Sequence, residues 1–83
     1  MNKILVKLSV PAVQTTFDLF MPPETQIRLL IPLLTNGIMS MTEKAYISSG
    51  WEKLMLKDSQ ILLKPDATLL DYGIHNGSVL ILV

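Results

Sequence analysis

Apolar and polar residues alternate over two stretches near the N-terminus, and this alternation predicts a pair of β-strands. In residues 3–10 the apolar positions that share one face are Ile4, Val6 and Leu8. A second alternating run covers residues 13–20. Pro11-Ala12 separates the two runs, and proline interrupts a strand because it has no N–H to donate. Two strands joined by so short a break are expected to form a hairpin.

The apolar spacing becomes helical after Pro22-Pro23. The positions on the predicted buried face are Ile27, Leu30, Ile31, Leu34 and Ile38. Thr25 is a suitable N-cap residue, and Asn36-Gly37 is a typical C-terminal stop. These signals predict a helix over roughly residues 25–36.

Two features of this helix are unusual. Pro32 lies inside it, where proline costs about 3 kcal/mol and is expected to kink the backbone. Leu29 and Leu33 lie away from the main apolar stripe, so the helix is apolar on nearly all sides. These two leucines therefore predict a second apolar patch on the outer helix surface.

The second half of the chain predicts short strands separated by turns. Residues 38–50 are expected to be a loop, and residues 51–56 a third strand. Residues 60–63 are expected to be a short fourth strand, and residues 79–83 the last one. A hairpin, a helix and then returning strands predict an α+β fold, in which a mixed sheet carries the helix across one face. The first and last strands are expected to be parallel neighbours.

Composition narrows the possible functions. A chain of 83 residues predicts a single domain over residues 1–83. With 7 basic and 7 acidic residues the net charge is zero, so nothing points to nucleic acid or to an anionic membrane as a partner. The longest apolar run, residues 29–34, is far shorter than the ~20 residues that span a bilayer, and no targeting signal is visible. Hydrophobic residues make up 49% of the chain and charged residues 17%, so some apolar surface should be exposed. Exposed apolar patches usually mark contact sites.

Residues able to carry out chemistry are few. The chain has no cysteine and one histidine, His75, so a metal site would have to rely on carboxylates. Asp66 and Asp71 lie in separate predicted turns, and no pattern joins them as an acid–base pair. We therefore expect neither enzymatic activity nor a cofactor nor a metal.

The segment from Thr68 to Val83 resembles the C-terminal part of ubiquitin, where a Leu-x-Asp-Tyr-x-Ile turn leads into the last strand. Here Leu69 and Ile74 can anchor the turn in the core. Asp71 can accept hydrogen bonds from backbone N–H groups, and the Tyr72 hydroxyl can bond to the backbone.

Over residues 3–83 the chain is similar to the YukD/EsaB-like proteins, which are small ubiquitin-like proteins found with type VII secretion systems of Gram-positive bacteria. The shared features are the length, the helix that opens near Pro23, the strand that begins at Trp51 and the segment from Leu62 to Leu80. The resemblance implies a ubiquitin-like β-grasp fold and a non-conjugated accessory protein that works in the cytoplasm. Its expected partners are other proteins, including a membrane component of the secretion system, or a second copy of the chain.

The ubiquitin pattern also places a candidate protein-binding patch on the sheet face away from the helix. Its expected residues are Leu5, Met55, Ile81 and Val83, with lysines at the edge. Trp51 shares the strand face of Met55 and is a candidate anchor for an interface. Two alternatives stay open: Trp51 covers the sheet edge, or some of the patch packs against the 38–50 loop.

A different functional class is a ubiquitin-like modifier or sulfur carrier, which needs a flexible Gly-Gly tail. This sequence ends at Val83 inside the last predicted strand, so we expect no conjugation; a longer native chain that ends in Gly-Gly would reverse this ranking. A further alternative is a regulatory domain that associates with itself.

Overall fold

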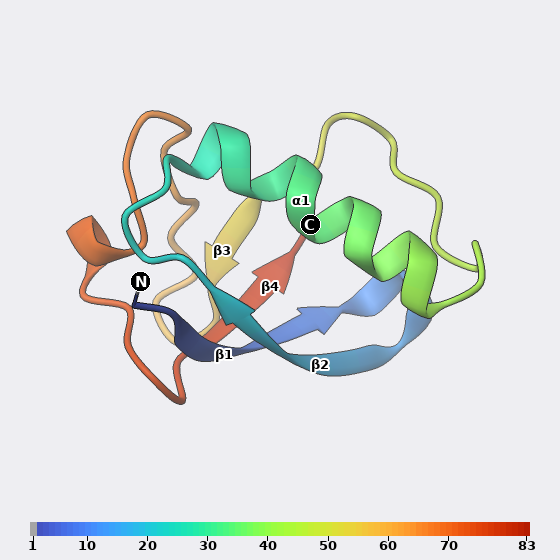
Figure 1. Cartoon of the computed structure of the whole chain (residues 1–83), viewed down its shortest axis with the longest axis horizontal. Helices are drawn as coiled ribbons and strands as arrows, with labels where there is room; N and C mark the ends of the chain where they lie inside the picture. Colours follow the sequence, from blue (N-terminus) through green and yellow to red (C-terminus); the bar gives the residue numbers. More distant parts are fainter. Residues whose placement is uncertain (1) are drawn as a thin grey trace.

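The computed structural model describes residues 2–83 and shows one sheet with a single helix across one of its faces (Figure 1). The elements are β1 (Ile4–Val10), β2 (Thr15–Met21), α1 (Ile27–Met41), β3 (Leu54–Leu56) and β4 (Val79–Leu82), with 3-10 turns at Pro11–Val13 and Leu70–Tyr72. The strand order is β2-β1-β4-β3, and only β1 and β4 are parallel. The hairpin, the mixed sheet and the parallel pairing of the first and last strands are thereby confirmed.

The core lies between α1 and the sheet face that α1 covers. Alternate residues of β1 and β4 point into it, and the register partners Leu8 and Leu80 are both fully buried. The helix contributes Ile27, Leu30, Leu34 and Ile38. These four positions are part of the stripe that the helical spacing predicted.

The hairpin turn moves the second strand from the predicted 13–20 to Thr15–Met21. Val13 belongs to the 3-10 turn instead, and the Gln14 N–H donates to the Pro11 carbonyl oxygen at 3.0 Å. Proline fixes φ near the value that such a turn needs, so the turn starts at Pro11 and extends further than a simple break.

The helix begins later than predicted, and Thr25 does not cap it. The N-cap residue is Gln26, and no side chain accepts a hydrogen bond from the first turn. The N–H groups of Ile27 and Arg28 donate instead to the carbonyl oxygens of Ala67 and Pro65, at 2.8 and 2.9 Å. A distant loop therefore satisfies donors that a capping side chain would otherwise satisfy.

The predicted stop at Asn36-Gly37 is wrong, since α1 continues to Met41 and takes in the first residues of the predicted 38–50 loop. Ile38 is fully buried, and its burial offsets the roughly 1 kcal/mol that glycine costs inside a helix. Thr42 follows as the C-cap residue, and its backbone N–H and hydroxyl both donate to the Ile38 carbonyl oxygen. The helix also continues through Pro32, which is exposed.

The predicted third strand is shorter than expected, and the predicted fourth strand is wrong. β3 is limited to Leu54–Leu56, although Lys53 and Val83 continue its ladder by donating N–H groups to each other's carbonyl oxygens. Of residues 60–63, only Leu62 bridges to β3, opposite Met55. Gln60 has a φ of 58°, which bends the chain out of the extended conformation needed for a strand.

The turn before the last strand has the contacts that the sequence predicted. The Thr68 N–H donates to the Asp71 carboxylate at 2.9 Å, and the Lys64 N–H donates to the Tyr72 hydroxyl oxygen at 2.9 Å. Leu69 and Ile74 are both buried.

Gly37 gives a test of the helix assignment. A Cβ added there meets nothing within 4 Å, so Gly37→Ala should stabilise the fold by about 0.5–1 kcal/mol by restricting the unfolded chain. The expected rise in Tm is roughly 2–8 °C by circular dichroism.

Gly73→Ala is the matched control, because Gly73 has a φ of 68° and an alanine would be strained there. Its Tm should fall. If Gly37→Ala lowers the Tm as well, residue 37 is not in a helical conformation and the sequence-based stop was right.

Candidate protein-interaction surfaces

The sheet face opposite α1, here called the open face, carries apolar side chains on β3 and β4. Because strand residues alternate between faces, Met55 and Ile81 point away from the core, while their neighbours Leu54 and Leu80 are fully buried. Met55 and Ile81 are direct register partners, and Val83 follows two residues later with half its surface exposed. The structure therefore brings together three of the expected patch residues, which we call the Met55–Ile81–Val83 patch.

This patch extends beyond β3, because Leu62 forms a bridge with Met55. Bridged antiparallel residues share a face, so Leu62, which is half exposed, adds to the apolar surface. Lys53 lies beside Val83 through their mutual backbone hydrogen bonds. The patch thus has Lys53 at its edge, whereas the lysines that the sequence placed beside it, Lys3 and Lys7, flank Leu5 on the first strand.

Leu5 is separate from the other three. On the open face, the β1 residue paired with Ile81 is Ser9. Leu5 is four residues away from Ser9 on β1, which corresponds to about 13 Å along the strand. Its direct partner on β2 is Phe20, which is 68% exposed. Between the two apolar groups lies an ion pair in which the Lys7 ammonium is 3.1 Å from the Asp18 carboxylate. The four predicted residues therefore form two groups, and the sequence reasoning missed Phe20.

Trp51 projects into solvent. It lies in the loop before β3 and is 84% exposed, so the alternative that it covers the sheet edge is wrong. Ile47, earlier in the same loop, is also largely exposed. Large apolar side chains held out in this way are typical of contact sites.

The conformation of this loop depends on the Glu52 carboxylate, which sequence reasoning did not single out. Its oxygens accept hydrogen bonds from the Tyr46 hydroxyl at 2.7 Å and the Ser48 hydroxyl at 3.0 Å. They also accept from the backbone N–H groups of Ser49 at 2.8 Å and Gly50 at 3.1 Å. The sequence signal is a run of short polar donors, Ser48-Ser49-Gly50, followed two residues later by a carboxylate.

These contacts shift the pKa values of both Glu52 and Tyr46. Burial of Glu52 on its own would raise its pKa, but the hydrogen bonds from Tyr46, Ser48 and the backbone prevail and lower the pKa to about 2. Burial, followed by the bond to Glu52, raises the pKa of Tyr46 to about 12. The loop is therefore fixed in the ionised form of Glu52, with Ile47 and Trp51 held outward.

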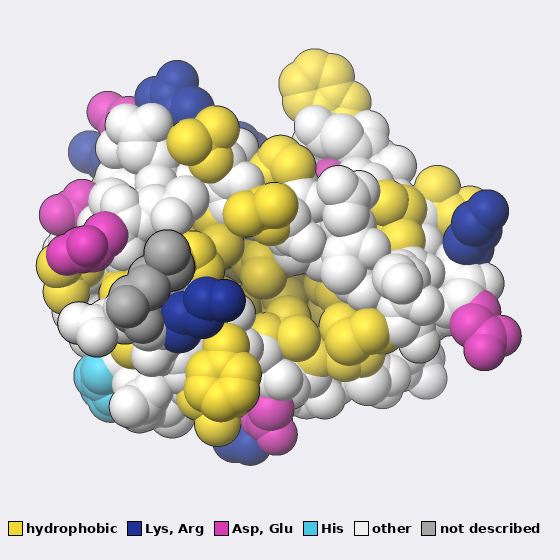
Figure 2. All heavy atoms as spheres, viewed as in Figure 1, with side chains coloured by type: hydrophobic (Ala, Val, Ile, Leu, Met, Phe, Trp, Pro, Cys, Tyr) yellow, Lys and Arg dark blue, Asp and Glu magenta, His cyan; other side chains and the backbone are white. Residues whose placement is uncertain are grey.

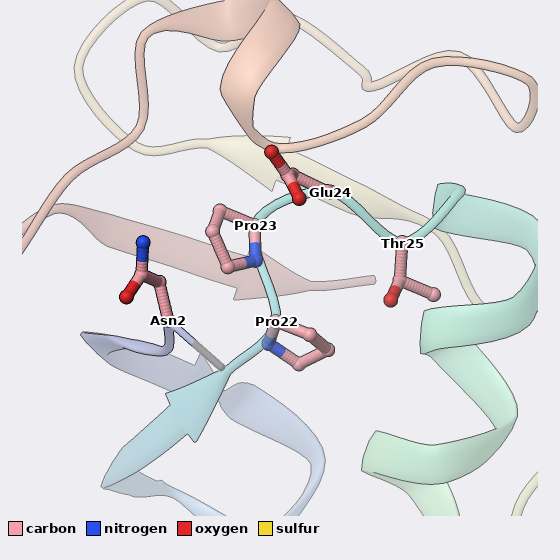
Figure 3. A pocket seen from close by; sticks show the side chains of 5 residues that line it. All are labelled: Asn2, Pro22, Pro23, Glu24 and Thr25. Carbon is pink, nitrogen blue, oxygen red and sulfur yellow. The ribbon is translucent and has the colours of Figure 1, made fainter.

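The surface hollow beside Pro22 and Pro23 does not have the geometry of a catalytic site. Figure 3 shows this hollow, of about 460 Å³, lined by Asn2, Pro22, Pro23, Glu24 and Thr25. The side chains of Glu24 and Thr25 point in different directions there, so they do not converge on a common ligand. Within residues 2–83 no cluster of three or more His, Cys, Asp or Glu side chains is arranged to hold a metal. No helix in the same range is long and apolar enough to cross a membrane.

The mixed sheet, the single crossing helix and the turn at Leu70–Tyr72 before the last strand define a ubiquitin-like β-grasp protein. The family described as "WXG100 protein secretion system (Wss), protein YukD" matches residues 5–82. The chain therefore belongs to the YukD family, which confirms the resemblance drawn from its sequence. Among curated protein sequences, none matches the chain significantly.

Solved structures with the same fold include ubiquitin-like domains of other type VII secretion proteins. The domain of EccD1 from Mycobacterium tuberculosis has a TM-score of 0.79 and 22% identity, covering 100% of this chain and 99% of that one. The EccD5 domain from Mycobacterium xenopi has a TM-score of 0.80 and 15% identity, covering 100% and 94%. A chain of the "MycP5-free ESX-5 inner membrane complex" has a TM-score of 0.82 and 12% identity; the match covers all of this chain and 21% of that one. At these identities the likeness shows a shared fold.

The role of Glu52 can be tested by pH. Its folded-state pKa lies below the ordinary value of 4.5, so its stabilisation is complete above pH 4.5 and is lost as the pH falls towards about 2. Glu52→Gln should therefore lower the Tm near neutral pH, at a cost of about 1–3 kcal/mol for hydrogen bonds to a charged group. The Tm difference from wild type should shrink as the pH falls from 4.5 to 2.

Glu43→Gln is the control, because it removes the same charge from an exposed position. It should change the Tm little at any pH. A wild-type–Glu52→Gln difference that stays constant from pH 7 to pH 2 would contradict the role of the carboxylate.

Proposed function

We propose that this chain is a non-conjugated protein-interaction module of a bacterial type VII secretion system, acting in the cytoplasm by docking rather than by catalysis. The Met55–Ile81–Val83 patch is the observation that carries this proposal. A solvated sheet face normally carries polar side chains, whereas this face carries an apolar group on β3 and the C-terminal half of β4.

Membership of the YukD family indicates what kind of partner to expect. YukD proteins are described as part of the WXG100 secretion system, and a chain that contains a similar domain belongs to an inner membrane complex of a related system. By analogy, the partner of this chain would be a protein component of its own secretion system, including membrane components with cytoplasmic segments. The zero net charge fits contact through apolar surface rather than long-range attraction.

The patch has a suitable composition for such a contact. Methionine adapts its shape to a partner, and Ile81 beside it supplies a stiff branched side chain. Trp51, which is 84% exposed, is a candidate anchor outside the sheet. Leu5 belongs to the other end of the face, next to Phe20, and would contribute to a contact that extends across β1.

The double variant Met55→Glu with Ile81→Lys tests the proposal. The two residues are direct cross-strand partners, so the new charges are opposite and adjacent, the net charge stays at zero and the fold should be retained. Binding to the secretion-system proteins encoded beside the gene, measured by pull-down and calorimetry, should fall at least tenfold, because charges are costly to desolvate in an apolar contact.

The matched control is Leu29→Glu with Leu33→Lys, on exposed positions of α1. This pair also keeps the net charge, and its i, i+4 spacing favours the helix. If the sheet variant unfolds, Met55 and Ile81 are core residues. If it stays folded and binds like wild type while the helix variant does not, docking is through α1.

A further inference from the structure

The two edges of the sheet differ in how far they are covered. On the β3 edge, the segment after β3 folds back: Leu62 bridges to Met55, and the Leu63 N–H donates to the Leu54 carbonyl oxygen at 2.8 Å. On the β2 edge, β1 is the one neighbour among the described residues. Every second N–H and C=O group along β2 therefore points away from the sheet, as in any edge strand.

β2 also lacks the features by which proteins usually protect an edge. It is 7 residues long and contains neither proline nor lysine. Its single charge, on Asp18, is engaged with Lys7 on the open face. The β2 edge is thus an uncovered strand whose outward backbone groups are available for hydrogen bonds.

An apolar groove of about 450 Å³ runs between this edge and α1. Its lining residues are Lys3, Leu19, Phe20, Pro22, Thr25, Leu30, Leu33, Leu34, Gly37 and Met41. Figure 2 shows the hydrophobic side chains that gather in this hollow, between the positions of α1 and β2 in Figure 1. Phe20, Leu33 and Met41 are each more than half exposed along it.

The groove has a charge at one end. Lys3 is the single charged side chain in its lining as the structure describes it. Lys3 directly precedes Ile4, the register partner of Met21, so it lies where β2 ends. An occupant would meet apolar surface along most of its length and a positive charge at this end.

From these features we infer that the groove binds an extended segment of another protein, which adds a fifth strand to the sheet beside β2. The free backbone groups of β2 fix the extended conformation. Because strand side chains alternate, every second residue of the segment enters the groove and is apolar. A carboxylate at the end near Lys3 completes the match in charge.

A second copy of this chain is a poorer occupant. In the two-fold antiparallel pairing that overlaps β2 fully with itself, Asp18 lies opposite its own copy. Like charges directly opposite each other destabilise a strand pair. An unrelated segment can instead carry a neutral or basic residue at that place.

The probe for this inference is a random dodecapeptide display library, selected on the intact chain. Enriched peptides should alternate apolar residues and carry Asp or Glu at one end. On binding, backbone amide signals of residues 15–21 should shift in NMR spectra, and the outward-facing amides of β2 should gain protection from hydrogen exchange.

Two variants separate this site from the sheet patch. Leu33→Glu with Met41→Lys changes exposed groove positions without altering net charge and should weaken peptide binding at least tenfold. Met55→Glu with Ile81→Lys should leave peptide binding unchanged, because that pair lies on the opposite face. Lys3→Glu should weaken the binding of acidic peptides and shift the selection towards basic ones.

Several outcomes would overturn the inference. These are a library that yields no binder, peptides with helical rather than alternating apolar spacing, and binders lost in the Met55 and Ile81 variant but not in the Leu33 and Met41 variant. If sedimentation detects dimers that are lost when β2 is altered, the β2 edge pairs with a second copy of the chain instead. Each of these results leaves the secretion-system contact through the sheet patch separately testable.

Discussion

A single helix is the one layer that covers the sheet, and this constraint governs the rest of the structure. Four strands have two faces, but α1 has only 15 residues and lies across one of them. The covered face takes the alternate residues of each strand, and Leu8 opposite Leu80 marks its centre. A domain of this size buries only about 60% of its unfolded-chain surface, so a chain rich in apolar residues must leave some of them outside. Within the strands, the alternation decides which apolar residues remain outside.

The start of the helix is held in place by a segment that lies some 40 residues later in the sequence. The first N–H groups of the helix donate to carbonyl oxygens of residues 65 and 67, and the Leu70 N–H donates to the Pro23 carbonyl oxygen at 3.0 Å. These contacts join the approach to α1 to the turn that precedes β4. Because β4 is parallel to β1, its position requires a crossover, and the 65–70 segment fixes where that crossover ends. One group of backbone hydrogen bonds therefore connects the start of the helix to the turn that precedes the last strand.

The sequence predicted the features that rest on local periodicity and missed those that rest on distant contacts. Alternation was sufficient for the hairpin and the outward position of Met55, and helical spacing identified the buried face of α1. The stop at Asn36-Gly37 failed because burial of Ile38 outweighs a weak local preference. The predicted cap at Thr25 is wrong because the first N–H groups of the helix donate to carbonyl oxygens some 40 residues away. The four acceptor contacts of Glu52, and the position of Phe20 beside Leu5, depend on loop conformation and strand register, which periodicity alone does not give.

Phe20 connects the two surfaces that this fold leaves apolar. It lines the groove beside α1 and also a hollow that it shares with Leu5, Lys7 and Asp18 on the open face. A strand added to β2 would therefore pack against a side chain whose other contacts belong to the sheet face. The Met55–Ile81–Val83 patch lies at the opposite side, with β1 between it and β2. A partner confined to that patch would be independent of the groove, whereas a partner that reached Leu5 would compete for Phe20 with any segment bound beside β2. The same alternation that hides one sheet face thus determines whether two contacts on this chain are independent or mutually exclusive.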